Sequence, residues 1–102
     1  MNVDQGTRRL ERTSELLKAL ASAARLGIVL ELSSAPRCVH DLTERVGTSQ
    51  SATSQHLRVL RNLRLVEGRR QGREVIYQLT DEHVGRIVAD ALQHVTERTD
   101  DR

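Results

Sequence analysis

Aromatic residues are nearly absent from this chain of 102 residues: Tyr77 is the only one, and there is no Phe or Trp. The hydrophobic core must therefore be built from Leu, Val, Ile and Ala, which is thin for a small domain on its own. We expect a second subunit to complete that core. The scarcity of aromatic side chains also argues against binding of single-stranded DNA or RNA, because such binding uses aromatic rings as stacking platforms.

Other absences narrow the class of protein further. Cys38 is the only cysteine, so no internal disulfide can form, which is typical of a reducing compartment. No stretch approaches the roughly 20 apolar residues of a membrane helix, and the first twenty residues are polar where a secretion signal is apolar. We expect a cytoplasmic protein with no membrane partner. With one Pro, six Gly and no internal repeats, residues 1–102 are expected to form a single domain.

The net charge is only +2, but the charges are unevenly distributed along the chain. Residues 49–80 hold six arginines against two glutamates, whereas residues 81–102 hold six acidic residues against three arginines. A basic middle segment of this kind favours a polyanionic partner.

Four helices are predicted in the first two thirds of the chain. After a flexible arm over residues 1–8, leucines at helical spacing predict a helix that ends near Ala21. Ser22 is suited to cap a second helix, which the serines and proline of residues 33–36 end. Residues 39–62 are predicted to form two short helices joined by a turn at Gly47, which is the form of a helix-turn-helix.

The last third of the chain predicts a hairpin and one more helix. Residues 65–79 cluster β-branched residues around an arginine-rich turn, which is typical of a β-hairpin. Residues 81–98 carry an apolar stripe at helical spacing, with Thr80 or Asp81 as the cap. The predicted fold class is therefore mainly α with a β-hairpin wing, a homodimeric winged helix-turn-helix in the order α-α-α-α-β-β-α.

The helix that ends near Asn62 has one packing face and one polar face. In a helix-turn-helix, polar side chains exposed on the second helix can contact base edges in the major groove, and arginines at a wing tip can contact phosphates. We therefore predict binding to double-stranded DNA. The candidate contacts are Ser51, Ser54, Gln55 and Arg58 on the helix and Arg69, Arg70 and Arg73 at the hairpin tip.

The last helix carries histidines and carboxylates along one flank of its apolar stripe. His83 and His94 are about 16 Å apart along a helix axis, so one helix cannot place both on one ion. Two copies of this helix can cross antiparallel about a two-fold axis near Val88. Asp81 and His83 of one copy then meet His94 and Glu97 of the other, and each dimer has two such sites. Two imidazoles and two carboxylates suit tetrahedral Zn(II), with Co(II) as the alternative ion.

Two weaker interpretations concern the same residue types. A catalytic zinc site keeps three protein ligands and an open position beside a general base, whereas this helix offers four ligands and no spare base, so an enzyme is not expected. Cys38, His40 and Asp41 form a second set of candidate ligands at the start of the third helix. Because no Cys or His before residue 30 could complete that set, we favour a half-buried cysteine and a capping aspartate there.

Four segments together resemble the ArsR/SmtB family of winged-helix metalloregulators: residues 38–42, 49–63, the wing residues 70–73 with 77–79, and the motif Asp81-x-His83-x10-His94-x2-Glu97. The last motif is the most specific part of the resemblance. The family implies a homodimeric repressor that holds an inverted-repeat operator when metal-free and releases it when metal binds. It also implies that the four residues of the last motif are zinc-sensing ligands.

The resemblance has one departure. His40 stands where family members that sense thiophilic ions have a second cysteine, so sensing of arsenic, lead or cadmium through the third helix is not expected. Cys38 and Asp41 lie where some zinc sensors of the family have a second, non-essential site. Two alternatives stay open: a repressor that answers to thiol oxidation or another non-zinc signal through Cys38, and a small zinc enzyme.

Overall fold

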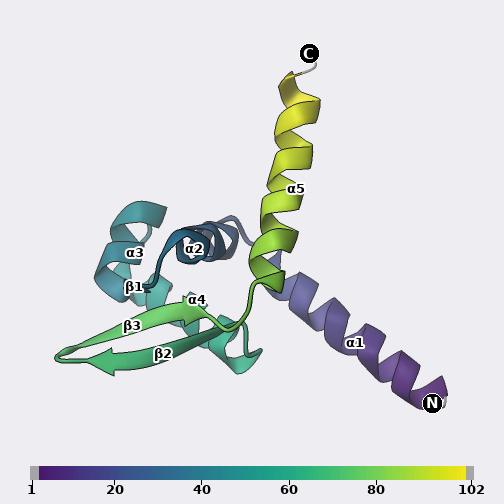
Figure 1. Cartoon of the computed structure of the whole chain (residues 1–102), viewed down its shortest axis with the longest axis horizontal. Coiled ribbons are helices and arrows are strands. Elements are labelled where there is room, and N and C mark those ends of the chain that lie inside the picture. The colour runs from purple at the N-terminus through teal and green to yellow at the C-terminus, as the bar shows by residue number, and fades with distance from the viewer. Residues whose placement is uncertain (1–2, 101–102) are drawn as a thin grey trace.

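The computed structural model describes residues 3–100, which form five helices and a three-stranded sheet (Figure 1). In chain order the elements are α1 (Val3–Leu20), α2 (Ala23–Ser34), β1 (Arg37–Cys38), α3 (Val39–Val46), α4 (Gln50–Asn62), β2 (Val66–Gln71), β3 (Glu74–Leu79) and α5 (His83–Asp100). Strand β3 lies between β1 and β2 and pairs antiparallel with both. The predicted winged helix-turn-helix is confirmed, with α3 and α4 as the helix-turn-helix and β2 and β3 as the wing.

Two features differ from the expectation. Helix α1 begins at Val3, so most of the segment 1–8, predicted as a flexible arm, is helical, and Asp4 in its first turn is favoured by the helix dipole. Strand β1 was not predicted at all. It is only two residues long, too short for a side-chain pattern, and forms because Arg37 and Cys38 pair with the middle of β3.

Local signals set the helix ends, and those at Ser22 and Gly47 behave as expected. The hydroxyl of Ser22 accepts a hydrogen bond from the Arg25 backbone N–H at 3.3 Å, and the hydroxyl of Ser49 accepts one from Ala52 at 3.0 Å. Gly47 ends α3 with φ of 77°, a left-handed conformation that favours glycine. These caps fix where α2 and α4 begin, and the glycine allows the tight turn between α3 and α4.

The core is aliphatic apart from one threonine. Its fully buried side chains come from α2, α3, α4 and β2, and they are Ile28, Val29, Leu42, Thr53, Leu57, Leu60 and Val66. Tyr77 is only partly buried and packs against the edge of this cluster. Three of the seven belong to α4, so one face of this helix is held firmly against the core.

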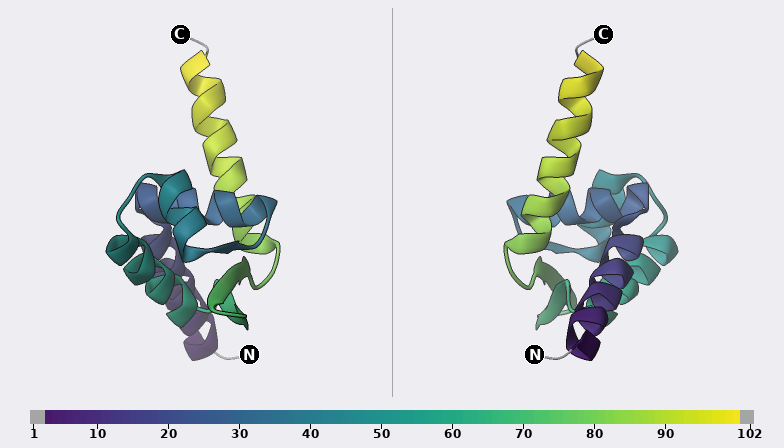
Figure 2. Two further views of the ribbon diagram at one scale, coloured as in Figure 1. Left: turned by 90° about the vertical axis from the view of Figure 1, so that its left-hand side faces the viewer. Right: turned by 90° about the vertical axis from the view of Figure 1, so that its right-hand side faces the viewer.

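Helices α1 and α5 extend beyond the core in different directions (Figures 1 and 2). In α5, Val84 and Val88 are buried, whereas residues 89–98 are all exposed. Val88 therefore belongs to the core of its own protomer and is not available at the two-fold axis that was expected beside it. Large apolar side chains are nevertheless exposed on both helices, namely Leu10, Leu17, Ile87, Leu92 and Val95. Among residues 3–100, no helix combines the length and the apolar character needed to cross a membrane.

Candidate nucleic-acid interface and metal ligands

The two helices of the helix-turn-helix are joined by a chain of hydroxyl groups as well as by apolar packing. Thr43 on α3 donates to the hydroxyl oxygen of Thr53 on α4 at 2.9 Å, and Thr53 donates to the Ser49 carbonyl at 2.8 Å. Thr53 is fully buried, so both bonds are shielded from water. The first bond holds α4 against α3, and the second holds the Thr53 hydroxyl to the first turn of its own helix. The helical spacing predicted that one face of this helix packs inward, but it could not identify Thr43 as a partner of Thr53 on that face.

The predicted polar face of α4 is confirmed as an exposed surface. Leu57 and Leu60 point into the core with 1% and 0% exposure, which leaves the opposite side of the helix in solvent. The exposed side chains on that side include the four predicted ones, Ser51, Ser54, Gln55 and Arg58. They offer hydroxyl, amide and guanidinium groups, which are the donors and acceptors that read base edges and phosphates.

The hairpin of β2 and β3 projects away from the helices (Figure 1), and three arginines lie in its outer half. Arg69 and Arg70 lie on β2, Arg73 lies in the turn beside Gly72, and all three are exposed. None of the ion pairs found within residues 3–100 involves them. No carboxylate of the described part of the chain is therefore paired with them, and their charges are available to an anion.

The base of the hairpin is packed more tightly than its tip. A Cβ atom at Gly68 would lie 2.9 Å from a methyl group of Val75 and 3.0 Å from the ring of Tyr77. The single aromatic ring of the chain thus lies over a glycine on the neighbouring strand. Across the same strand pair, Gln78 donates to Glu67 at 2.9 Å. These contacts hold the two strands of the wing against each other.

A contact between α2 and α4 was not predicted from the sequence. The Arg25 guanidinium lies 3.1 Å from Nδ1 of His56 and also donates to the Ala19 carbonyl at the end of α1. Because arginine has only donors, Nδ1 of His56 must be the acceptor and the ring is neutral. Burial, followed by the charge of Arg25, lowers the pKa of His56 below its ordinary value of 6.5. His56 is half-buried on the packing side of α4, so this contact joins α4 to α2 on the side away from the exposed polar face.

The four candidate zinc ligands on and beside α5 form two separated pairs. Asp81 accepts a hydrogen bond from the backbone N–H of His83 at 2.8 Å, and its Oδ1 lies 3.2 Å from Nδ1 of His83. His94 and Glu97 lie near the far end of the helix, and all four side chains are exposed. Within residues 3–100 of one protomer, no three His, Cys, Asp or Glu side chains gather where they could hold an ion. The donor set fits Zn(II) in chemistry, but one protomer holds only half of it at each end of α5.

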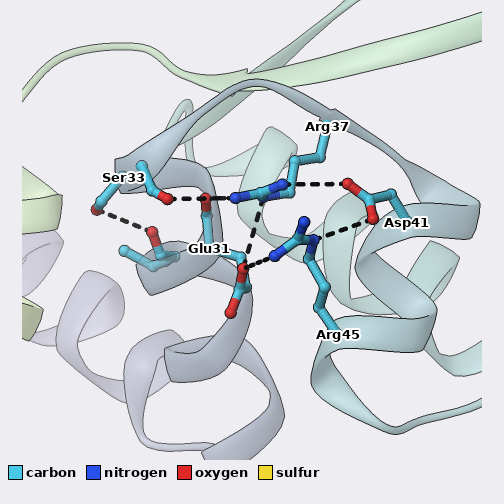
Figure 3. A network of polar contacts seen from close by, with 7 residues as sticks. Glu31, Ser33, Arg37, Asp41 and Arg45 are labelled. Carbon is cyan, nitrogen blue, oxygen red and sulfur yellow. Dashed lines mark hydrogen bonds and ion pairs between the residues drawn. The ribbon is translucent and has the colours of Figure 1, made fainter.

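The second candidate set, Cys38, His40 and Asp41, is not brought together. The Asp41 carboxylate accepts hydrogen bonds from Arg37 at 3.2 Å and from Arg45 at 3.0 Å (Figure 3). His40 lies 3.7 Å from Glu44 and is exposed. Cys38 is half-buried as predicted, but the prediction that Asp41 caps α3 is wrong, because Cys38 occupies the N-cap position. The carboxylate of Asp41 is attracted by two arginines instead.

Those arginines belong to a network that joins α2, β1 and α3. Arg37 and Arg45 also reach the Glu31 carboxylate, at 3.5 and 3.4 Å (Figure 3). Each guanidinium group of the network therefore contacts both carboxylates. The hydrogen bond from Arg45, together with the one from Arg37 and the charges of both arginines, holds the pKa of Asp41 below its ordinary value of 3.8. Metal binding by Asp41 would have to compete with the two arginines that contact its carboxylate.

Comparison with known proteins gives consistent matches to regulators. The sequence model of the family described as bacterial regulatory protein, arsR family, matches residues 22–68. The chain is 46% identical over 88 residues to the HTH-type transcriptional repressor SmtB of Mycobacterium tuberculosis, covering 86% of this chain but 65% of that relative's length. It is 46% identical over 83 residues to the HTH-type transcriptional regulator NmtR of the same organism, covering 81% of this chain and 69% of that protein.

A solved structure gives the same result for the fold. The structure of the homodimeric winged helix-turn-helix DNA-binding domain of Mb0332 from Mycobacterium bovis has a TM-score of 0.87 to this chain at 28% identity. The match covers 99% of this chain and 94% of that domain. With this fold and these relatives, the chain belongs to the arsR family of bacterial regulatory proteins, a family of transcriptional regulators rather than of enzymes.

Proposed function

We propose that this protein is a homodimeric, metal-responsive transcriptional repressor. The metal-free dimer binds an inverted-repeat operator in double-stranded DNA, and Zn(II) or Co(II) lowers its affinity for that operator. The observation that carries the proposal is the pairing of an exposed polar face on α4 with an arginine-tipped wing on one firmly packed unit. The relatives named as a repressor and a regulator support the same function.

On DNA, α4 and the wing have different tasks. Gln55 and Arg58 on the exposed face of α4 contact base edges in the major groove, with Ser51 and Ser54 beside them. The wing arginines contact phosphates, which position the protein but carry no sequence information. Two copies related by a two-fold axis then read two half-sites about one helical turn apart, or a multiple of that distance.

The exposed apolar side chains of α1 and α5 support the dimer. Leu10 on α1 is 73% exposed, and Leu92 and Val95 on α5 are 50% and 59% exposed, although they are large apolar groups. Leu10 and Leu17 also line a hollow of about 450 Å³ on α1 that can accept side chains of a second copy. Burying these surfaces supplies the core that a chain with one aromatic residue lacks. The Mb0332 domain, described as homodimeric, is consistent with this assembly.

In the dimer, Asp81 and His83 of one protomer and His94 and Glu97 of the other provide the four ligands of each metal site. These two imidazoles and two carboxylates would hold Zn(II), which would link the two chains in one relative position. Because the ligands come from two chains, closing the site sets the angle between the two α5 helices. That angle in turn sets the separation of the two α4 helices, since α5 is anchored to the core through Val84 and Val88.

Metal can release DNA only if it binds the geometry of the DNA-free dimer more tightly than that of the bound dimer. A typical coupling free energy of about 1 to 3 kcal/mol weakens operator binding roughly 5- to 150-fold. Fluorescence anisotropy of a labelled operator, titrated with Zn(II), Co(II), Ni(II) and Cd(II), tests the proposal. Release by Zn(II) or Co(II) supports it. Operator binding that ignores every ion but changes on oxidation of Cys38 would instead establish the redox alternative.

A further inference from the structure

A cluster of arginines on α1 has no role in the function described so far. Arg8, Arg9 and Arg12 are exposed and, with Gln5, line a hollow of about 270 Å³ on the N-terminal half of the helix. None of the ion pairs found among residues 3–100 involves any of the three. We call these three side chains the α1 arginine surface.

The acidic residues of α1 do not cover this surface. Asp4, Glu11 and Glu15 occupy the neighbouring sector, roughly 20° to 60° around the helix axis from Arg8 and about 60° or more from Arg9 and Arg12. Within the described part of the chain, no carboxylate lies close enough to the three guanidinium groups to form an ion pair with them. One side of the helix therefore presents three positive charges together.

The proposed dimer leaves this surface in solvent. The exposed Leu10 and Leu17 lie roughly 140° around the helix axis from the centre of the arginines. The arginines share their sector instead with Leu16 and Ala19, one or two turns later, which pack against the protomer's own core. A second copy that covers Leu10 and Leu17 thus approaches α1 from another side.

The direction of α1 carries its N-terminal half away from the tip of α5 and beyond the core (Figures 1 and 2). The N-terminal end of α1 and the hairpin both lie at the end of the molecule away from the tip of α5, and they project from the core in opposite lateral directions (Figures 1 and 2). The helix extends past the edge of the core there, so the arginines are not covered by the body of the protomer. An elongated polyanion lying along α4 and the wing has room to pass this end of α1.

We propose that the α1 arginine surface is an additional phosphate-contacting site for double-stranded operator DNA. Arg8, Arg9 and Arg12 bind the sugar-phosphate backbone outside the segment read by α4 and the wing. This inference rests on the proposed DNA-binding function and enlarges its footprint. Because phosphate contacts carry no sequence information, the surface adds affinity without adding discrimination.

Operator affinity measured between 50 and 300 mM salt tests the inference. The variant carries Arg8→Gln, Arg9→Gln and Arg12→Gln. Each phosphate that the protein neutralises contributes about 0.9 to the slope of log affinity against log salt concentration, so a dimer without these six arginines has a slope shallower by about 5. The ratio of operator to scrambled-sequence affinity should stay unchanged. Circular dichroism and sedimentation check that α1 and the dimer are intact.

Two further variants complete the design. Arg98→Gln removes an exposed arginine near the C-terminal end of α5, which lies away from the α1 arginine surface. This control should leave the salt slope unchanged. The triple Arg→Lys variant at positions 8, 9 and 12 should keep most of the slope, because a phosphate contact of this kind requires mainly the charge.

A triple Gln variant whose slope lies within one unit of the Arg98→Gln control would overturn the inference. So would a triple Gln variant that dissociates into monomers more readily while its remaining dimers bind DNA as tightly as the unmodified dimer. In both cases the unmodified protein still binds its operator. If the proposed function itself is wrong, the unmodified protein prefers no inverted repeat at any salt concentration, so the two failures are distinguishable.

Discussion

Two parts of this protein differ in how much of each is complete within one protomer. The reading unit is α4 with the wing, and the sensing unit is the set of candidate metal ligands Asp81, His83, His94 and Glu97. Helix α4 and the wing are held by the core, by the Thr43–Thr53 hydroxyl bond and by Tyr77 packed over Gly68. Helix α5 leaves the core after Val88, and its exposed half carries His94 and Glu97 with no further ligand nearby among residues 3–100. One chain thus suffices to build the DNA-reading surface, whereas the proposed metal site requires two. Regulation can then act on the relation between protomers without altering the reading surface itself.

The largest effect is expected from charge placed at two positions of α5 that differ in burial. Val88→Asp puts a carboxylate into the protomer core, where Val88 is 3% exposed, and should destabilise the fold by about 3 kcal/mol or more. Leu92→Asp, one turn later and 50% exposed, should leave the fold intact and produce monomers. Thermal unfolding followed by circular dichroism, together with sedimentation velocity, separates the two outcomes. A folded monomer of Val88→Asp would show that the boundary between core and interface is misplaced.

The second effect concerns the response to metal. His83→Gln or His94→Gln should abolish the roughly 5- to 150-fold release of DNA by Zn(II) while leaving metal-free binding unchanged, because neither residue touches the reading unit. Cys38→Ser is the matched control and should respond to Zn(II) as the unmodified protein does. If Cys38→Ser alone removed the response, the sensing site would lie at the start of α3 rather than on α5.

The third effect distinguishes the two parts of the reading unit. Gln55→Ala should lose about 1 to 3 kcal/mol of discrimination between the operator and a sequence altered at one contacted base pair. Arg73→Ala should instead weaken binding to all sequences and flatten the salt slope by about one unit for each phosphate that is no longer neutralised. Affinities for matched and mismatched fragments at several salt concentrations measure both. Equal loss of discrimination in the two variants would mean that the wing also reads bases.

The smallest effect is expected from the contact between His56 on α4 and Arg25 on α2. The pKa of His56 is lowered in the folded protein relative to its ordinary value of 6.5, so the unfolded chain takes up a proton first as the pH falls. The stability contributed by neutral His56 is therefore present above about pH 6.5 and is lost as the pH drops below that value. His56→Gln, which can still accept a bond from Arg25, should lose less stability between pH 7 and pH 5. Urea unfolding at both pH values checks this, and parallel losses in the two proteins would contradict it.

Most of the fold could be predicted because its signals are local. Ser22 and Ser49 cap their helices, Gly47 takes the left-handed conformation, and the polar side chains of α4 point away from the core. These features depend on residues three or four positions apart. Strand β1 could not be predicted in the same way, because it forms only through pairing with β3, about forty positions later.

The site was predicted unevenly for the same reason. The exposed face of α4 and the arginine-tipped turn follow from helical spacing and from the composition of the hairpin. Contacts between distant elements left no pattern in the sequence, as with Arg25 and His56 or with the Glu31, Arg37, Asp41 and Arg45 network. That network explains why Asp41 does not cap its helix. The spacing of His83 and His94 predicted two half-sites, but a single chain cannot supply the partner that completes them.

The central claim, that each metal site is shared between two protomers, can be tested with a mixed dimer. One chain carries His83→Gln, the other carries His94→Gln, and two different affinity tags isolate the heterodimer. If sites form between chains, each homodimeric variant has both sites damaged, whereas the heterodimer keeps one intact site and loses both halves of the other. The account predicts one tightly bound Zn(II) per heterodimer and none per homodimer, as measured by competition with a chelating indicator. Tight binding of two ions by either homodimer, or of none by the heterodimer, would contradict it.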